Sequence, residues 1–123
     1  MDADPYGPRV RELFQRNPGA GRLQGEGVCS GRAGGAQHGA EVVLWLRVLE
    51  GTIQEARYQV LGCPHTMAAA ASVVELLVGQ SVTSAKVDAA RIAESLNLPA
   101  EKLGRVLMLE DALENALAGR IPA

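Results

Sequence analysis

Two runs of residues typical of β-strands, separated by a short turn, occupy the middle of the chain. Residues 41 to 48 carry apolar side chains at every second position, namely Val42, Leu44, Leu46 and Val48. After the turn at Leu49-Glu50-Gly51-Thr52, a second run ends at Leu61. In it Ala56, Tyr58 and Val60 alternate with the polar residues Glu55, Arg57 and Gln59. This pattern predicts an antiparallel hairpin with one buried face.

The spacing of apolar residues changes to that of a helix directly after the hairpin. Pro64 fits a first helical position, and apolar residues then recur at helical spacing until Gly79, namely Met67, Ala70, Ala71, Val74, Leu77 and Val78. Further helices are predicted over residues 7 to 16, from a cap at Asp88 to Leu96, and over residues 100 to 118. The predicted apolar face of the last helix consists of Leu103, Val106, Leu107, Leu113, Ala116 and Leu117.

Residues 19 to 39 contain more than half of the glycines and predict a loop-rich stretch with one irregular edge strand. Strands gathered early and helices gathered late indicate an α+β fold. We therefore expect a small antiparallel sheet of about three strands, covered on one face by helices, in a single domain spanning residues 1–123.

The composition excludes several classes of function. Twelve basic residues are set against 14 acidic ones, giving a formal charge of -2, so no electrostatic footprint for nucleic acid is present. The longest apolar run, from Val42 to Leu46, is too short to cross a membrane. The acidic amino terminus lacks the features of a secretory signal, so we expect a cytoplasmic protein in which Cys29 and Cys63 are reduced.

The junction Leu61-Gly62-Cys63-Pro64-His65, where a strand ends and a helix begins, is the most informative position for chemistry. A thiol at a helix amino terminus faces backbone N–H groups that stabilise the thiolate, which is the form that binds metal or attacks sulfur. The alternative is that Cys63 is a small buried residue. His65 is a poor chelating partner for it, because residues two apart on a helix point about 200° apart.

Two other residues could take part in such a site. His38 lies in a glycine-rich loop before the first strand of the hairpin, where it could be a delivered ligand or a solvated polar residue. Cys29 is expected to be a structural or surface thiol. The sequence contains neither a phosphate-binding loop nor the signature of a hydrolase triad.

A series of short blocks runs from residue 55 to residue 112. They are Glu55-Ala56-Arg57-Tyr58, Leu61-Gly62-Cys63-Pro64, the helix from Ala71-Ser72 to Gly79-Gln80-Ser81, Ile92-Ala93-Glu94, Leu98-Pro99, Lys102-Leu103 and Leu109-Glu110-Asp111-Ala112. In this order and spacing they resemble the IscU and NifU N-terminal family of iron-sulfur cluster assembly scaffolds. The resemblance covers nearly the whole chain and implies the same α+β fold.

The resemblance also implies a site. In that family three cysteines, with an aspartate and a histidine, hold a nascent iron-sulfur cluster or a zinc ion. Cys63 matches the second cysteine, His38-Gly39-Ala40 stands where the first cysteine and the aspartate occur, and Gly104-Arg105 stands where the His-Cys pair occurs. The resemblance therefore implies that Cys63 and His38 bind iron, zinc or a cluster, since histidine can replace a thiolate as an iron ligand.

The family also suggests partners. A cysteine desulfurase is implied as the sulfur donor, and an Hsp70-type chaperone would bind the loop that here reads Leu98-Pro99-Ala100-Glu101-Lys102. The first hypothesis is a scaffold, not an enzyme, that receives sulfur or binds iron at Cys63 with help from His38. The second is a degenerate scaffold that acts as an interaction module without a cluster, and a third is a thiol enzyme with Cys63 as nucleophile.

Overall fold

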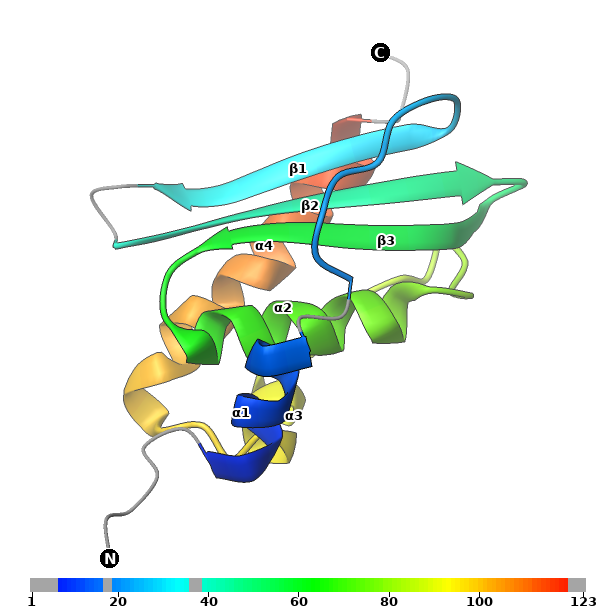
Figure 1. Ribbon diagram of the computed structural model, residues 1–123. Coiled ribbons are helices and arrows are strands. Elements are labelled where there is room, and N and C mark those ends of the chain that lie inside the picture. The colour runs from blue at the N-terminus through cyan, green and yellow to red at the C-terminus, as the bar shows by residue number, and fades with distance from the viewer. Residues whose placement is uncertain (1–6, 17–18, 36–38, 120–123) are drawn as a thin grey trace, which may run out of the picture.

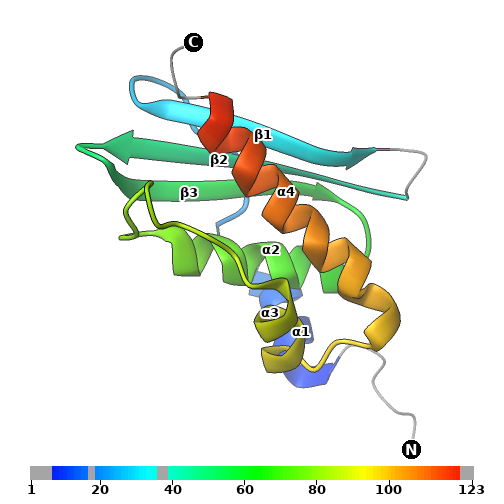
Figure 2. The same cartoon turned by 180° about the vertical axis from the view of Figure 1, so that it is seen from behind.

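The computed structural model describes residues 7–16, 19–35 and 39–119. Its elements, in chain order, are α1 (Gly7–Arg16), β1 (Val28–Gly35), β2 (Ala40–Leu49), β3 (Thr52–Leu61), α2 (Pro64–Leu77), α3 (Ala89–Ser95), the 3-10 turn η2 (Ala100–Lys102) and α4 (Leu103–Gly119). The helices lie on one side of the sheet (Figures 1 and 2). The predicted α+β fold, with a three-stranded antiparallel sheet, is confirmed.

The sheet has the order β1-β2-β3, and both pairs of strands are antiparallel. Glu50 and Gly51, at the turn of the β2–β3 hairpin, have φ angles of 52° and 76°. Positive φ at both central residues is typical of a turn whose twist matches that of the strands. The predicted inner face of β2 is buried, since Val42, Leu44 and Leu46 are fully covered.

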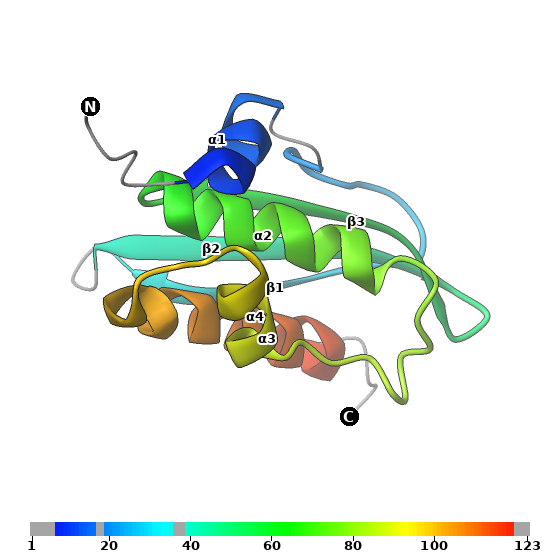
Figure 3. The same cartoon turned by 90° about the horizontal axis from the view of Figure 1, so that it is seen from below.

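Helices α2 and α4 pack side by side beneath the sheet, and α1 and α3 pack against them (Figure 3). Helix α2 lies under β3, while α4 crosses β1 and β2. Gly31 on β1 makes the crossing possible, because a Cβ atom there would overlap the backbone of Ala112 and Ala116 on α4. The glycine of this edge strand is therefore a packing requirement.

The ends of the helices follow the sequence signals. Pro64 opens α2, and α2 ends at Leu77. Beyond it Gly79 turns the chain with a φ of 95°, and its N–H donates to Ile53 O at 2.8 Å. Asp88 caps α3 by accepting a hydrogen bond from the Arg91 N–H at 3.2 Å.

The predicted apolar face of α4 is partly wrong. Leu103 and Leu107 are 37% and 44% exposed, whereas Leu109 and Ala112 are fully buried. Helix α4 is inclined to the sheet, and its start lies farther from the strands than its end does, so these two leucines are less covered (Figure 2). None of the helices in the described part of the chain is long and apolar enough to cross a membrane.

The outer face of the sheet is crossed by the segment between α1 and β1 (Figure 1). The Gly21 N–H donates to Tyr58 O at 2.9 Å, which attaches the start of this segment to the edge of β3. Arg47 then donates to the carbonyl oxygens of Gln24 and Glu26 at 2.9 and 2.8 Å. The Arg22 guanidinium lies 5.8 Å from the centre of the Trp45 ring.

Candidate functional site

One end of the molecule gathers the start of β2, the end of β3 and the starts of α2 and α4 (Figure 1). The hairpin register pairs Glu41 with Leu61, so the residues just beyond the hairpin ends lie close together. A Cβ atom on Gly62 would lie 3.4 Å from that of Ala40. Ala40, the last residue of the stretch that resembles the family's first ligand motif, is therefore adjacent to the Cys63 junction.

Cys63 is the residue that caps the amino terminus of α2. Its backbone is extended, with φ -85° and ψ 167°, and Pro64 follows at the first helical position. Its side chain is half-buried, so the sulfur is not sealed in the core. The predicted placement of the thiol at a helix start matches this geometry.

The environment of Cys63 favours the thiolate. Burial raises the pKa of the Cys63 thiol, but hydrogen bonds from the Thr66 hydroxyl and from the backbone N–H groups of Thr66 and His65 lower it. The positive charge of Lys102 lowers it further, and the net result is a pKa below the ordinary value of a cysteine. The Cys63 Sγ lies 3.5 Å from Thr66 Oγ1.

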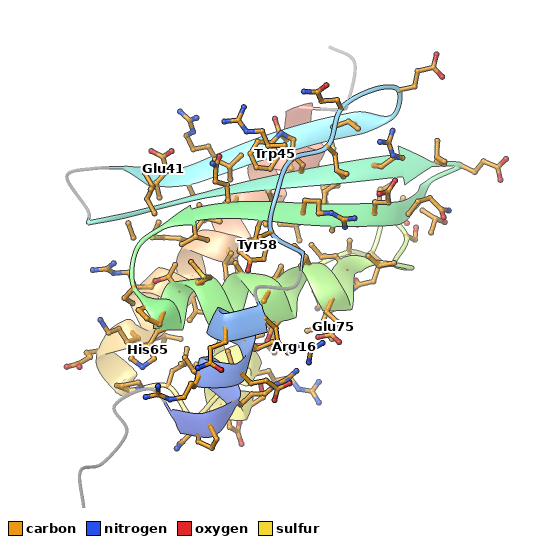
Figure 4. All side chains as sticks on the ribbon, viewed as in Figure 1. Arg16, Glu41, Trp45, Tyr58, His65 and Glu75 are labelled. Carbon is orange, nitrogen blue, oxygen red and sulfur yellow. The ribbon has the colours of Figure 1, made fainter. Side chains whose placement is uncertain are left out.

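His65 lies closer to Cys63 than its spacing indicates. Its Nδ1 is 4.0 Å from the Cys63 Sγ, and its side chain is only 5% exposed. The expectation that the two residues point apart holds only within a helix, and Cys63 is outside the helical region. In Figure 4, His65 lies at the first turn of α2, on the side away from the sheet.

Two positively charged side chains, one from η2 and one from the start of α4, reach this end of the protein. Lys102 ends the η2 turn and acts on Cys63 through its charge. Arg105 donates from Nη1 to Gly39 O at 3.2 Å, which links α4 to the residue before β2. Sequence reasoning missed Thr66 and Lys102, and the signal that could have found Thr66 is its position three residues after a helix cap.

The two remaining candidate residues of the sequence analysis are His38 and Cys29. His38 lies outside the described residues, so its ligand role stays a prediction. Cys29 is partly buried on β1 and packs against the core, opposite Leu46 on β2, which fits a structural thiol. Both cysteines are in the described part of the chain, and they do not form a disulfide bond.

The donor groups that the described residues place at this end do not by themselves fit a metal ion. The described residues here supply one thiolate, Cys63, and one buried imidazole, His65, together with the cations Lys102 and Arg105. The carboxylate at this end, Glu41, forms an ion pair with Arg32. Structural zinc sites use four ligands from cysteine, histidine and carboxylate side chains. Within residues 7–16, 19–35 and 39–119, no group of three or more such side chains could hold a metal.

A shallow hollow of about 300 Å³ adjoins the junction. It is lined by Gly35, Gly39, Ala40, Glu41, Leu61 and Gly62. Leu61 at its rim is 69% exposed. The hollow opens to solvent beside Gly62, the residue before Cys63.

Comparison with known proteins identifies relatives of this chain. The scaffold protein IscU of Escherichia coli, named for iron-sulfur cluster assembly, is 34% identical over 117 residues, covering 92% of this chain and 91% of that protein. The mitochondrial iron sulfur cluster assembly protein 1 of Yarrowia lipolytica is 33% identical over 105 residues, covering 84% of this chain and 58% of that protein.

Solved structures show the same fold. The N-terminal part of a nitrogen-fixing NifU-like protein from Brucella abortus has a TM-score of 0.70 at 15% identity, covering 94% of this chain and 93% of that chain. A putative iron-sulfur cluster assembly scaffold protein from Fervidobacterium islandicum has a TM-score of 0.69 at 16% identity, covering 91% and 96%. The model of the NifU-like N terminal domain matches residues 5–119, and the chain belongs to that family.

Proposed function

We propose that this protein acts in iron-sulfur cluster assembly as a scaffold-type protein, rather than as an enzyme, and that it receives sulfur on Cys63. The observation that carries the proposal is the half-buried Cys63 thiol at the start of α2, with its pKa lowered by Thr66, His65 and Lys102. The names of the relatives, which are scaffold and assembly proteins, support the same process.

The sulfur step needs no oxidant from outside the reacting pair. The Cys63 thiolate attacks the terminal sulfur of a persulfide on the donor protein, forming a new sulfur-sulfur bond as the donor's own bond breaks. The donor cysteine leaves as a thiolate, and Cys63 then carries the persulfide. A cysteine desulfurase is the donor that we propose, in a cytoplasm that keeps both thiols reduced.

Iron binding and chaperone binding, the two other parts of the hypothesis, rest on the family resemblance. Iron binding by Cys63 and His38 stays a prediction, because His38 lies outside the described residues. Binding of an Hsp70-type chaperone also stays a prediction. In the relevant stretch Leu98 packs against the core, which leaves less of its side chain for a partner.

The test is sulfur transfer from a purified cysteine desulfurase with cysteine as substrate. Mass spectrometry of the intact protein and of its peptides is expected to show one added sulfur atom on Cys63. A Cys63→Ser variant should gain none, whereas Cys29→Ser should behave like the wild type. Sulfur on Cys29 alone, or on neither cysteine, would contradict the proposal. Equal binding of the desulfurase to wild type and Cys63→Ser, without transfer, would favour the interaction module.

A further inference from the structure

Two cations lie at the end of the protein that carries Cys63, Lys102 at the end of η2 and Arg105 in the first turn of α4. Lys102 lies close enough to act on the Cys63 thiol through its charge, and Arg105 reaches Gly39, whose neighbour Ala40 lies beside Gly62. Both side chains are half-buried, so solvent only partly screens them. A thiolate beside these cations attracts a second anion more readily than an isolated thiolate would.

Negative charge does not balance these cations within the adjoining hollow. Glu41, the acidic residue in its wall, forms an ion pair with Arg32 on β1 at 3.4 Å. Ala40, the neighbour of Glu41, is only 3% exposed and packs beside Gly62. The wall nearest the Cys63 junction is therefore formed by small uncharged residues.

Arg105 also connects two separate parts of the chain. Its Nη1 donates to Gly39 O at 3.2 Å, and a Cβ atom on Gly39 would lie 3.5 Å from its Nη2. The guanidinium thereby links the start of β2 to the first turn of α4. A metal ion with ligands from both parts would make the same connection, but it would have to approach the fixed positive charge of Arg105.

We propose that Lys102 and Arg105 make the Cys63 site selective for anionic sulfur over metal cations, and that Arg105 makes the link that a metal would otherwise provide. The proposal rests on the proposed function, because it specifies what the same thiol accepts. The ligand is a sulfane sulfur carried by an anion. In the reaction with polysulfide, the Cys63 thiolate takes one sulfur atom and a polysulfide shorter by one sulfur leaves with both negative charges.

The rate test compares two electrophiles on a Cys29→Ser background. Sodium polysulfide is anionic and iodoacetamide is neutral, so the ratio of their rates reports attraction by charge, separately from the fraction of thiolate. Replacing Lys102 and Arg105 together by methionine, which keeps much of their length, is expected to lower this ratio about tenfold at low salt. The matched control, Arg91→Met on exposed α3, should leave the ratio unchanged.

The metal test uses zinc ions and a chromophoric chelator under anaerobic conditions. The wild type is expected to leave zinc with the chelator. Arg105→Cys removes the cation and adds a thiol at this end, so it should take up zinc, whereas Arg91→Cys adds a thiol elsewhere and should not. Circular dichroism of each variant verifies that it is folded.

The outcomes separate the two proposals. If the wild type gains no sulfur from the desulfurase or from polysulfide, the proposed function fails. If it gains sulfur but the rate ratio is the same in the double methionine variant, the selectivity inference fails by itself. Zinc uptake by the wild type that is lost in Cys63→Ser would also overturn the inference.

Discussion

At the scale of single residues, the chemistry of Cys63 depends on neighbours that linear spacing does not disclose. The sequence was sufficient to predict a thiolate at the start of a helix, because Pro64 marks that start. The sequence was insufficient to predict that the His65 ring lies near the Cys63 thiol, because the extended backbone at Cys63 changes the angle between the two side chains. The effect of the Lys102 charge on Cys63 could not be predicted from spacing, since Lys102 lies in a turn 39 residues further along the chain.

The Thr66 hydroxyl is the side chain that most directly favours the Cys63 thiolate. Thr66→Val keeps the shape of this fully buried residue but removes its hydrogen bond at 3.5 Å, so the pKa of Cys63 should rise. On a Cys29→Ser background, the iodoacetamide rate at neutral pH should fall several-fold, and the midpoint of its pH profile should move to higher pH. A variant in which that midpoint stays in place would show that the hydroxyl does not control the thiol.

At the scale of elements, periodicity predicted which segments are helices and strands better than it predicted which faces are buried. The inner face of β2 matched, because one side of that strand is fully covered by helices. The face of α4 did not match, because the start of that helix lies away from the sheet and leaves Leu103 and Leu107 exposed. The burial of a helical position depends on which partner lies beside it, and that information is not local.

The contact between β1 and α4 depends on the absence of a side chain at Gly31. Gly31→Ala would place a Cβ atom against Ala112 O and Ala116 N, backbone atoms that cannot move aside by changing rotamer. Overpacking of this kind should lower the free energy of unfolding by about 3 kcal/mol, measured by urea denaturation. Ser30→Ala, at the exposed neighbouring position on the same strand, should change it by less than about 0.5 kcal/mol. Equal stabilities for the two variants would argue against close packing of α4.

At the scale of the whole molecule, the order of strands and helices predicted the α+β architecture and the single helical layer. The path of residues 19 to 27 over the outer face was not predicted, because glycine-rich sequence has little periodicity to read. That path is held by long-range bonds, above all by Arg47, which also pairs with Glu55 at 2.8 Å. Trp45 lies on the same outer face of the sheet (Figure 4).

Loss of Arg47 should release this segment without unfolding the sheet. Arg47→Met removes the bonds to Gln24 and Glu26, so amide hydrogen exchange of residues 21 to 27 should quicken. The emission of Trp45, the chain's single tryptophan, should move to longer wavelength as Arg22 and its segment leave the ring. Arg91→Met is the control, because Arg91 is exposed on α3, away from the outer face of the sheet. Unchanged emission in Arg47→Met would show that the segment is held by other contacts.

The tight turn at Glu50 and Gly51 has a practical consequence. It stands at the opposite end of a ten-residue strand from Leu61, and therefore about 30 Å from the reactive thiol. A Cβ atom on Gly51 would meet open space, but the φ of 76° at Gly51 disfavours any side chain at that position. Glu50, the other residue of the turn, already carries a side chain. A fluorophore or surface tether attached through residue 50 would let sulfur delivery be watched in single molecules from a distance that leaves the donor's approach clear.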